Sequence, residues 1–562
     1  MSSHSEFISQ VLGRQHELTA VEEFALKHDL KQIPDGQTRY QELIPKSAPG
    51  PGQQYAFEVD LDRCTGCKAC VTACHNENGL DEDETWRSVG LIHGGPPENP
   101  AIQHITSACH HCLEPACASG CPVKAYEKDP VTGVVKHLDD QCIGCQYCIL
   151  KCPYDVPKYN KKRGIVHKCD MCIGRLKEGE APACVKACPS EAIRITVVDT
   201  EKVRTSPSSY VGNVPDAPGS DYTLPTTRYK TNRVFPSGMV SSDHHMLKPE
   251  HSHMPLVVLL VFTQLSVGAF FTQILINPYL NEALRAAIVP YHAMVGFLTG
   301  QLALAASIVH LGRPLYAFRA IIGFRTSWMS REIVFFGLFA VLSAVYAFGY
   351  WVSPLGAFLQ TIYLGPIKFQ MDYLGFGVFL SGLSGVFCSI MIYKDTKRPF
   401  WDNYFTTAKF LITMVLLGFA TIFLAMTVLA AAGIGQTVNE FMSSFGTALI
   451  QVIMTMVMLK LLVEFLIFLN LSSKHLTFLK KTAVLMTGSL RAFTVNRCLC
   501  GIIGGIILPS WLFGYQNNLP DMMAVLSVFA IFTLVLTGEF LERYLFFRAV
   551  VPLKMPSGTN TH

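Results

Sequence analysis

Sixteen of the nineteen cysteines lie in four groups before residue 190, and their spacing is typical of metal-cluster ligands. Three thiolates two residues apart on a curling loop can hold three corners of one [4Fe–4S] cubane. The fourth thiolate, three residues further on at the start of a helix, then reaches the neighbouring cluster. The four groups are Cys64, Cys67, Cys70 and Cys74; Cys109, Cys112, Cys117 and Cys121; Cys142, Cys145, Cys148 and Cys152; and Cys169, Cys172, Cys184 and Cys188.

Clusters bound in this way come in interlocked pairs, so the four groups predict four [4Fe–4S] clusters. The second group has a wider internal gap, and the fourth contains an 11-residue insertion from Ile173 to Ala183, which a loop can accommodate. The spacing alone leaves open which groups pair.

Zinc sites and disulfides are the alternative roles for these cysteines. A tetrahedral zinc site needs four ligands, and the repeated CxxCxxCxxxCP pattern is more specific to iron–sulfur clusters. The N-terminal residues MSSHSEFISQVLGRQHELTAVEEF contain neither the apolar core of a secretory signal nor a twin-arginine pair. We therefore expect reduced thiols in a cytoplasmic domain.

Long apolar segments follow residue 254, and they indicate a membrane domain. Half of all residues are hydrophobic and 16% are charged, while a net charge of +4 gives no indication of nucleic-acid binding. Most segments reach the roughly 20 residues needed to cross a bilayer. We expect eight, at roughly 255–276, 286–309, 333–352, 373–393, 410–432, 441–463, 498–515 and 522–541.

The loop charges predict the orientation of this domain. Fifteen Lys and Arg residues, Arg497 and Arg543 among them, flank the segments on the side shared with the cysteine groups, against Arg285 and Lys368 on the other. The positive-inside rule therefore places both termini and the cysteine-rich domain in the cytoplasm, beside the inner membrane.

Two motifs place polar residues near the membrane edge. His310, in IVHLGRP, ends the second apolar segment, and Glu332, in SWMSREI, begins the third. A histidine titrates near neutrality, and a carboxyl group in a partly dry site can relay a proton. In the alternative interpretation, His310 caps a helix and Glu332 pairs with Arg331 or Arg313.

Two further sets of polar residues carry weaker signals. Lys460 and Glu464 are four apart, so we expect them to pair on one helix face, with their ends reaching the membrane interface. Residues 201–253 are rich in Pro, Ser, Thr and Tyr and predict an extended strap. Its histidines, expected to be solvated, are His244, His245, His251 and His253.

The cysteine-rich part resembles the iron–sulfur subunit of dimethyl sulfoxide reductase-type molybdoenzymes over about residues 55–200. The resemblance is carried by FEVDLDRCTGCKAC, CHHCLEPAC, CIGCQYC, CPYDVPKYN and KCDMC. It implies that groups one and four pair, as do groups two and three. The implied ligand sets are Cys64, Cys67, Cys70 and Cys188; Cys169, Cys172, Cys184 and Cys74; Cys109, Cys112, Cys117 and Cys152; and Cys142, Cys145, Cys148 and Cys121.

The apolar part resembles the membrane anchor of the same enzymes over about residues 254–556. The resemblance is carried by PLVVLLVFTQLSVGAF, HLGRP, SWMSREI, IYKDTKRPFW and GEFLERYLFF. It implies that His310 and Glu332 bind quinol, where a histidine can hydrogen-bond a quinone oxygen. It also implies that the strap runs over a catalytic subunit. Residues 1–54 depart from the family. The stretch HELTAVEEFALKHDL has the pattern of an amphipathic helix, but we expect residues 1–54 to form a surface arm on a partner subunit.

Together these signals predict an α+β protein in which a double ferredoxin-like domain precedes an all-α, eight-helix membrane domain. The expected divisions are an extension (1–54), the cluster domain (55–200), the strap (201–253), the anchor (254–556) and a tail (557–562). Without a pterin-binding domain of its own, the chain would pass electrons between quinol and a separate molybdopterin subunit in anaerobic respiration. The alternatives are reverse flow, as in a cytoplasmic sulfite dehydrogenase or another sulfur-oxidising enzyme, and a partner without molybdenum.

Overall fold

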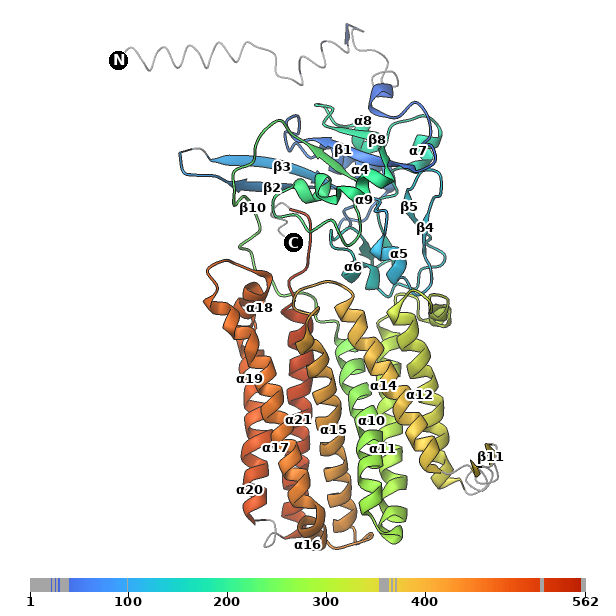
Figure 1. Ribbon diagram of the computed structural model, residues 1–562, viewed down its shortest axis with the longest axis vertical. Helices are drawn as coiled ribbons and strands as arrows, with labels where there is room; N and C mark the ends of the chain where they lie inside the picture. Colours follow the sequence, from blue (N-terminus) through green and yellow to red (C-terminus); the bar gives the residue numbers. More distant parts are fainter. Residues whose placement is uncertain are drawn as a thin grey trace.

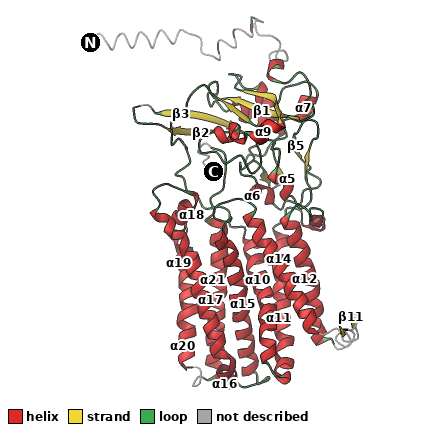
Figure 2. Ribbon diagram, in the orientation of Figure 1, coloured by secondary structure: helices red, strands yellow, loops and turns green. Residues whose placement is uncertain are grey.

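The computed structural model describes residues 40–98, 100–352, 371–515 and 520–556, together with positions 22, 26, 29, 30, 363, 364, 367 and 368. A cysteine-rich domain sits on one end of a long helical bundle (Figure 1). The strands lie almost entirely in that domain (Figure 2), so the predicted α+β organisation is confirmed. Most of the expected N-terminal arm, including its helix, and the tail at 557–562 lie outside the described residues.

The first three-stranded sheet brings the two ends of the cysteine-bearing segment together. Strand β1 (Gln53–Asp60) lies between β8 (Ile193–Asp199), which is antiparallel to it, and β9 (Arg228–Lys230), which is parallel. Val59 pairs with Ile193 in this register. The first cysteine group follows β1 and the fourth precedes β8, so this pairing places the two groups side by side.

A short hairpin brings the second and third cysteine groups together. Strand β4 (Tyr126–Lys128) pairs antiparallel with β5 (Val135–His137), and Tyr126 lies opposite His137. Cys121 precedes β4 and Cys142 follows β5, so the end of the second group meets the start of the third.

The strap contributes strands to two sheets of the cysteine-rich domain. It supplies β9 to the first sheet and β10 (Val240–Ser241) to a second sheet, where β10 pairs with β2 (Ser88–Gly94) and β2 with β3 (Ala101–Ser107). The remaining α-helices and strands of the domain are α4 (Ala69–Asn78), α5 (Ala116–Gly120), α6 (Tyr147–Lys151), β6 (Lys158–Asn160), β7 (Ile165–His167), α7 (Ile173–Lys177), α8 (Ala183–Lys186) and α9 (Thr200–Thr205).

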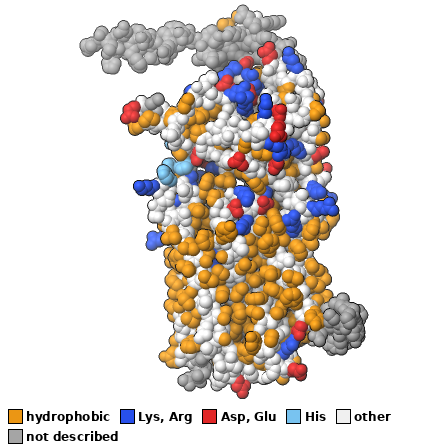
Figure 3. All heavy atoms as spheres, viewed as in Figure 1, with side chains coloured by type: hydrophobic (Ala, Val, Ile, Leu, Met, Phe, Trp, Pro, Cys, Tyr) orange, Lys and Arg blue, Asp and Glu red, His pale blue; other side chains and the backbone are white. Residues whose placement is uncertain are grey.

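Eight helical segments among the described residues are long and apolar enough to cross a membrane, as predicted. They contain the helices α10 (Met254–Ile276), α11 (Glu282–Val309), α12 (Trp328–Trp351), α14 (Met371–Lys394), α15 (Tyr404–Ala431), α16 (Val438–Phe441), α17 (Thr447–Phe465), α19 (Arg491–Ile502), α20 (Leu508–Tyr515) and α21 (Asp521–Arg548). Helix α18 (Phe478–Thr487) lies in the loop that joins the sixth and seventh segments. Figure 3 shows hydrophobic side chains covering the visible face of this bundle, with charged side chains concentrated at its ends and on the cysteine-rich domain.

Helices α10 and α15 join the two halves of the bundle at a close backbone crossing. A Cβ on Gly268 would lie 2.0 Å from the Met414 carbonyl oxygen, and one on Gly418 would lie 2.3 Å from the carbonyl oxygen of Gly268. Glycine at both positions lets the helix backbones touch, which is how membrane helices pack without a hydrophobic driving force between them.

Charged side chains form a buried network among α15, α17, α19 and α21. Lys460 is fully buried, 3.2 Å from Glu539 and 4.0 Å from Glu464. The expected Lys460–Glu464 pair is present, but the expected reach of Lys460 to the interface is wrong because neighbouring helices enclose its ammonium group. We call this set the charged network; its members are Lys409, Lys460, Arg497, Arg543, Glu464, Glu539 and Glu542.

The charged network also changes the number of positive residues that can be counted in the loops. Arg497 and Arg543 are 3% and 0% exposed inside the bundle, so they do not belong to a loop. Without these two, thirteen Lys and Arg residues lie on the cluster side against two on the other, so the positive-inside rule still predicts the same orientation.

Candidate functional site

The first and fourth cysteine groups exchange their last members. Cys64, Cys67, Cys70 and Cys188 line one small cavity. Burial raises the pKa of Cys74 to about 12, and the neighbouring thiol of Cys184 contributes to that rise. Cys74 therefore lies with the fourth group, as the antiparallel pairing of β1 and β8 requires.

The second and third groups exchange members in the same way. Cys109, Cys112, Cys117 and Cys152 line a second small cavity. Burial raises the pKa of Cys121 to about 11, and the nearby Cys142 thiol contributes to the shift. The thiols of Cys145 and Cys148 also interact with Cys121. These four sets bring together the same cysteines that the family resemblance implied.

The surroundings of the thiols fit iron–sulfur clusters. Lys168, which is 3% exposed, donates to the Cys109 sulfur at 3.5 Å, and the buried Arg87 guanidinium lies among the thiols of the first and fourth groups. Such cations and sulfur hydrogen bonds offset the charge of thiolate-bound clusters and tune them. Backbone N–H groups donate to sulfur from Gly144 to Cys142 (3.4 Å), Ala125 to Cys121 (3.2 Å), Met171 to Cys169 (3.4 Å) and Ala192 to Cys188 (3.3 Å).

The arrangement is too open for single ions. Within the described parts of the chain, no three His, Cys, Asp or Glu side chains converge on a point that could hold one metal ion. A tetrahedral zinc site would need such convergence, whereas thiolates at the corners of a cubane stand further apart.

The third cysteine group docks directly on the membrane domain. Gly144 has φ +70°, and a Cβ there would lie 2.2 Å from the Gly164 carbonyl oxygen and 2.9 Å from Gly312 Cα. Arg313 donates from its backbone N–H to the Ile143 carbonyl oxygen at 3.1 Å. The CIGC loop and the HLGR loop thus touch backbone to backbone, which only glycine permits at this distance.

A cavity of about 920 Å³, here called the membrane-edge cavity, opens beside this contact. Cys145 and Tyr147 line its wall on the cysteine-rich side, and His310 and Glu332 line it from the membrane domain. Its rim includes apolar side chains that are 48% (Ile308), 77% (Val309) and 70% (Phe318) exposed. An apolar molecule dissolved in the bilayer could enter through such a rim.

His310 both ends a helix and faces the cavity. It is the C-cap residue of α11, and its ring packs edge to face against His253 with centroids 5.2 Å apart. Burial lowers the pKa of His310 to about 4, and His251 contributes to that shift. The ring is therefore neutral at physiological pH and can accept a hydrogen bond from a hydroxyl group.

Glu332 is held by a neighbouring helix and not by an arginine. It lies near the start of α12, is 8% exposed and accepts a hydrogen bond from the Ser389 hydroxyl of α14. Arg331 donates to backbone carbonyls of Phe324 and Arg325. Arg313 donates to the carbonyl oxygen of Asp139 at 2.8 Å. Within the described residues, the structure therefore does not show the expected alternative of a Glu332 salt bridge.

Several lining residues escaped the sequence reasoning. The expected solvation of the strap histidines is wrong for His253, whose ring lies between those of His251, at 5.0 Å, and His310. Tyr147 lies between two cysteines of the third group and donates to the Ile392 carbonyl oxygen at 3.0 Å. The position of HSH directly before the first apolar segment was the available signal, because it places these rings at the membrane level of His310.

Comparison with known families agrees with this geometry. The family model of the DMSO reductase anchor subunit (DmsC) matches residues 248–548, more than half of the chain. Models of a 4Fe-4S binding domain and a 4Fe-4S dicluster domain match residues 55–76 and 101–198.

Curated relatives match the cysteine-rich part. An anaerobic dimethyl sulfoxide reductase subunit of Haemophilus influenzae is 35% identical over 190 residues, which are 32% of this chain and 91% of the relative. The subunit of the same name in Escherichia coli K12 is 35% identical over 187 residues, 32% of this chain and 89% of the relative. The hydrogenase-2 operon protein HybA of Escherichia coli O157:H7 is 34% identical over 208 residues, 31% of this chain and 60% of the relative.

Fold and site thus define a multi-pass membrane protein with an iron–sulfur electron-transfer domain. The chain belongs to the DMSO reductase anchor subunit family, and an iron–sulfur subunit similar to the dimethyl sulfoxide reductase relatives is fused ahead of its anchor. Its role is electron transfer and membrane anchoring in a complex of the DMSO reductase type.

Proposed function

We propose that this chain passes electrons between a membrane quinol, menaquinol or ubiquinol, and a separate molybdopterin-containing catalytic subunit through four [4Fe–4S] clusters. One observation carries the proposal: a thiol of the third cysteine group, Cys145, and the two predicted quinol-binding residues line the same cavity. All sixteen cysteines of the four groups serve as cluster ligands in this proposal, in the four mixed sets described above.

The cavity residues have separable tasks in this reaction. His310, with its neutral ring, accepts a hydrogen bond from one quinol hydroxyl, and the Glu332 carboxyl faces the cavity as a proton-accepting group. Ser389 fixes the Glu332 side chain. The bound clusters would supply one-electron transfer, and Cys145 would hold the one nearest the quinol.

The direction of flow and the location complete the proposal. We favour quinol oxidation that feeds a terminal reductase in anaerobic respiration, with the iron–sulfur domain and both termini on the cytoplasmic side of the inner membrane. The same module run in reverse would serve a sulfite dehydrogenase or another sulfur-oxidising enzyme. The chain on its own would not transform the terminal substrate.

A partner without molybdenum is the second candidate, and the similarity to HybA favours it specifically. Metal analysis of the native complex purified from membranes separates the two. Molybdenum or tungsten together with about sixteen iron atoms per chain, in addition to any in the partner, would establish the molybdoenzyme complex. Iron at that level beside a partner that lacks a pterin would establish the second candidate.

A His310→Ala variant tests the quinol site within the complex. It should keep its iron content and its reduction by dithionite but lose reduction of the clusters by menadiol, because one quinol hydroxyl loses its hydrogen-bond partner. His475→Ala is the matched control, since His475 is exposed in a loop away from the cavity. Normal reduction of His310→Ala by menadiol would remove His310 from the mechanism.

A further inference from the structure

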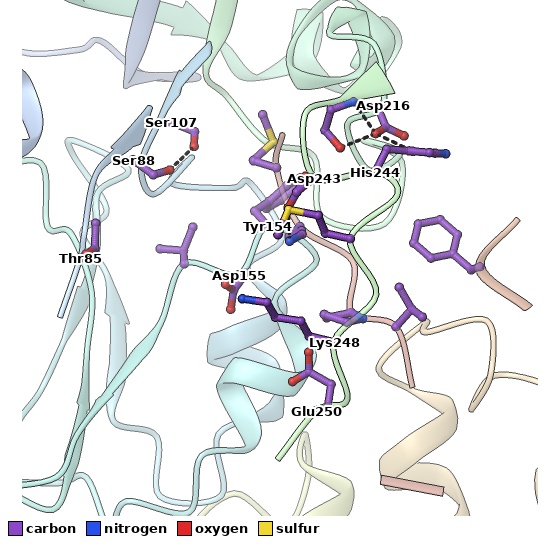
Figure 4. A pocket seen from close by; sticks show the side chains of 18 of the residues that line it. Thr85, Ser88, Ser107, Tyr154, Asp155, Asp216, Asp243, His244, Lys248 and Glu250 are labelled. Atoms are coloured by element: carbon purple, nitrogen blue, oxygen red, sulfur yellow. Dashed lines mark hydrogen bonds and ion pairs between the residues drawn. The ribbon is translucent and has the colours of Figure 1, made fainter. Parts of the chain in front are cut away.

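A second cavity, of about 360 Å³, lies between the cysteine-rich domain, the strap and the C-terminal residues. We call it the polar chamber. Figure 4 shows Asp155, Lys248 and Glu250 grouped at one end, with Asp216 and His244 at the other. Asp216 accepts a hydrogen bond from the Ser241 hydroxyl at 2.7 Å and interacts with His244 at 3.2 Å. Lys248 is exposed, so the chamber meets solvent.

The polar chamber and the membrane-edge cavity adjoin. Asp155, Glu250 and Pro552 line both of them. The backbone N–H of Glu250 donates to the Arg548 carbonyl oxygen at 3.0 Å, which fixes this part of the strap against the end of α21. The side chain of Glu250 therefore stands at the boundary between an apolar, bilayer-facing space and a polar, solvent-facing one.

A row of imidazole rings leads toward the same boundary. The ring of His253 lies 5.2 Å from that of His310 and 5.0 Å from that of His251, which is the residue after Glu250. All three rings line the membrane-edge cavity. Groups that can carry a proton thus extend from the predicted quinol site to Glu250.

We propose that the Glu250 carboxylate carries quinol protons from the membrane-edge cavity into the polar chamber, an inference that rests on the quinol chemistry proposed above. Oxidation of one quinol releases two electrons, which pass singly to the clusters, and two protons from its hydroxyl groups. Each proton leaves a quinol oxygen for the proton-accepting groups that line the membrane-edge cavity, then forms an O–H bond on Glu250 and passes to water in the chamber, which restores the carboxylate. Quinone reduction uses the same steps in reverse.

The electrostatic setting suits Glu250 to this task better than its neighbour Asp155, which is ion-paired with Lys158 at 2.6 Å. Burial raises the pKa of Glu250, and Arg398 opposes that rise. A carboxyl group with a raised pKa accepts a proton more readily near neutral pH. The titratable and charged groups that face it are Arg398, Asp155, Lys158, Lys248, Lys554, His251 and His253.

The test measures reduction of the clusters by menadiol in the complete complex. Glu250→Gln should lower the rate about 10²-fold, as expected for loss of a general base, and should flatten its pH dependence. The KM for menadiol and full reduction by dithionite should be unchanged. The matched control is Glu98→Gln, because Glu98 is exposed in the β2–β3 connection and lines neither cavity.

A second variant separates proton transfer from a structural role. In Glu250→Ala, added formate can enter the polar chamber and replace the lost carboxylate, so it should restore part of the rate. A wild-type rate and pH profile in Glu250→Gln would overturn the proposal, as would a slow Glu250→Ala variant that formate does not rescue. If menadiol fails to reduce even the wild-type clusters while dithionite succeeds, the proposed quinol chemistry itself is wrong.

Discussion

The charged network makes the stability of the membrane domain testable with two matched substitutions. It contains four cations and three carboxylates, and Glu539 lies between two of the cations, 3.2 Å from Lys460 and 2.8 Å from Arg497. Both Lys460 and Glu539 are 0% exposed. Glu539→Gln leaves four cations facing two carboxylates, whereas Lys460→Met leaves three facing three.

The expected magnitudes follow from this difference. Breaking a buried ion pair by removing one partner costs about 3–5 kcal/mol, because the other charge stays buried without compensation. We therefore expect Glu539→Gln to lower the free energy of unfolding by about 3–5 kcal/mol. Lys460→Met removes the surplus cation and keeps the Arg497–Glu539 pair, so we expect a loss of about 1–2 kcal/mol.

Unfolding by SDS in mixed micelles measures both values. Trp401 is a native reporter, because its ring is 1% exposed and its indole N–H donates to the Phe546 carbonyl oxygen at 2.9 Å. Glu282→Gln serves as the control, since Glu282 is exposed at the start of α11 and should change the free energy by less than about 0.5 kcal/mol. A larger loss for Lys460→Met than for Glu539→Gln would refute the charge-balance argument.

Two further predictions concern pH and charge movement. Burial lowers the pKa of both His253 and His310 from 6.5 to about 4, so the stability their neutral rings contribute is complete above pH 6.5 and is lost as the pH falls toward 4. The thermal unfolding temperature of the complex should therefore fall over that interval, less steeply in His253→Gln; equal slopes would contradict this. In the proposed reaction, quinol protons and electrons leave the membrane-edge cavity toward the same side. Turnover in proteoliposomes should therefore generate no membrane potential, and a response from a potential-sensitive dye would contradict this.

Local spacing was sufficient to predict the cysteine groups and the apolar segments. The gaps in CTGCKAC and CIGCQYC are short-range geometry, and a run of about 20 apolar residues has one stable environment. Local spacing could not predict the exchange of Cys74 and Cys188 between groups, because that exchange depends on the pairing of β1 with β8, which are more than a hundred residues apart. The family resemblance supplied that information, whereas spacing did not.

The polar interior of the bundle escaped prediction for a different reason. Lys460 and Glu464 form a local i, i+4 pattern, but Arg497 and Glu539 come from helices whose order around the bundle no local pattern reveals. Sequence position alone therefore predicts an interface location for charged residues near helix ends. The membrane-edge cavity escaped prediction for the same reason, because Glu332 of α12 and Ser389 of α14 come together only when these helices pack.

The fusion of the two parts has a structural consequence for the site. Noncovalent contacts also join them: Tyr147 donates a hydrogen bond to the Ile392 carbonyl oxygen, and Lys151 donates one to the Asp395 carboxylate at 2.6 Å. The covalent connection in addition lines both cavities through Glu250, and it lines the membrane-edge cavity through His253 beside His310. Because the strap continues directly into α10, the fusion fixes these side chains against the third cysteine group. The connection between the two parts is thus itself a wall of the proposed quinol site.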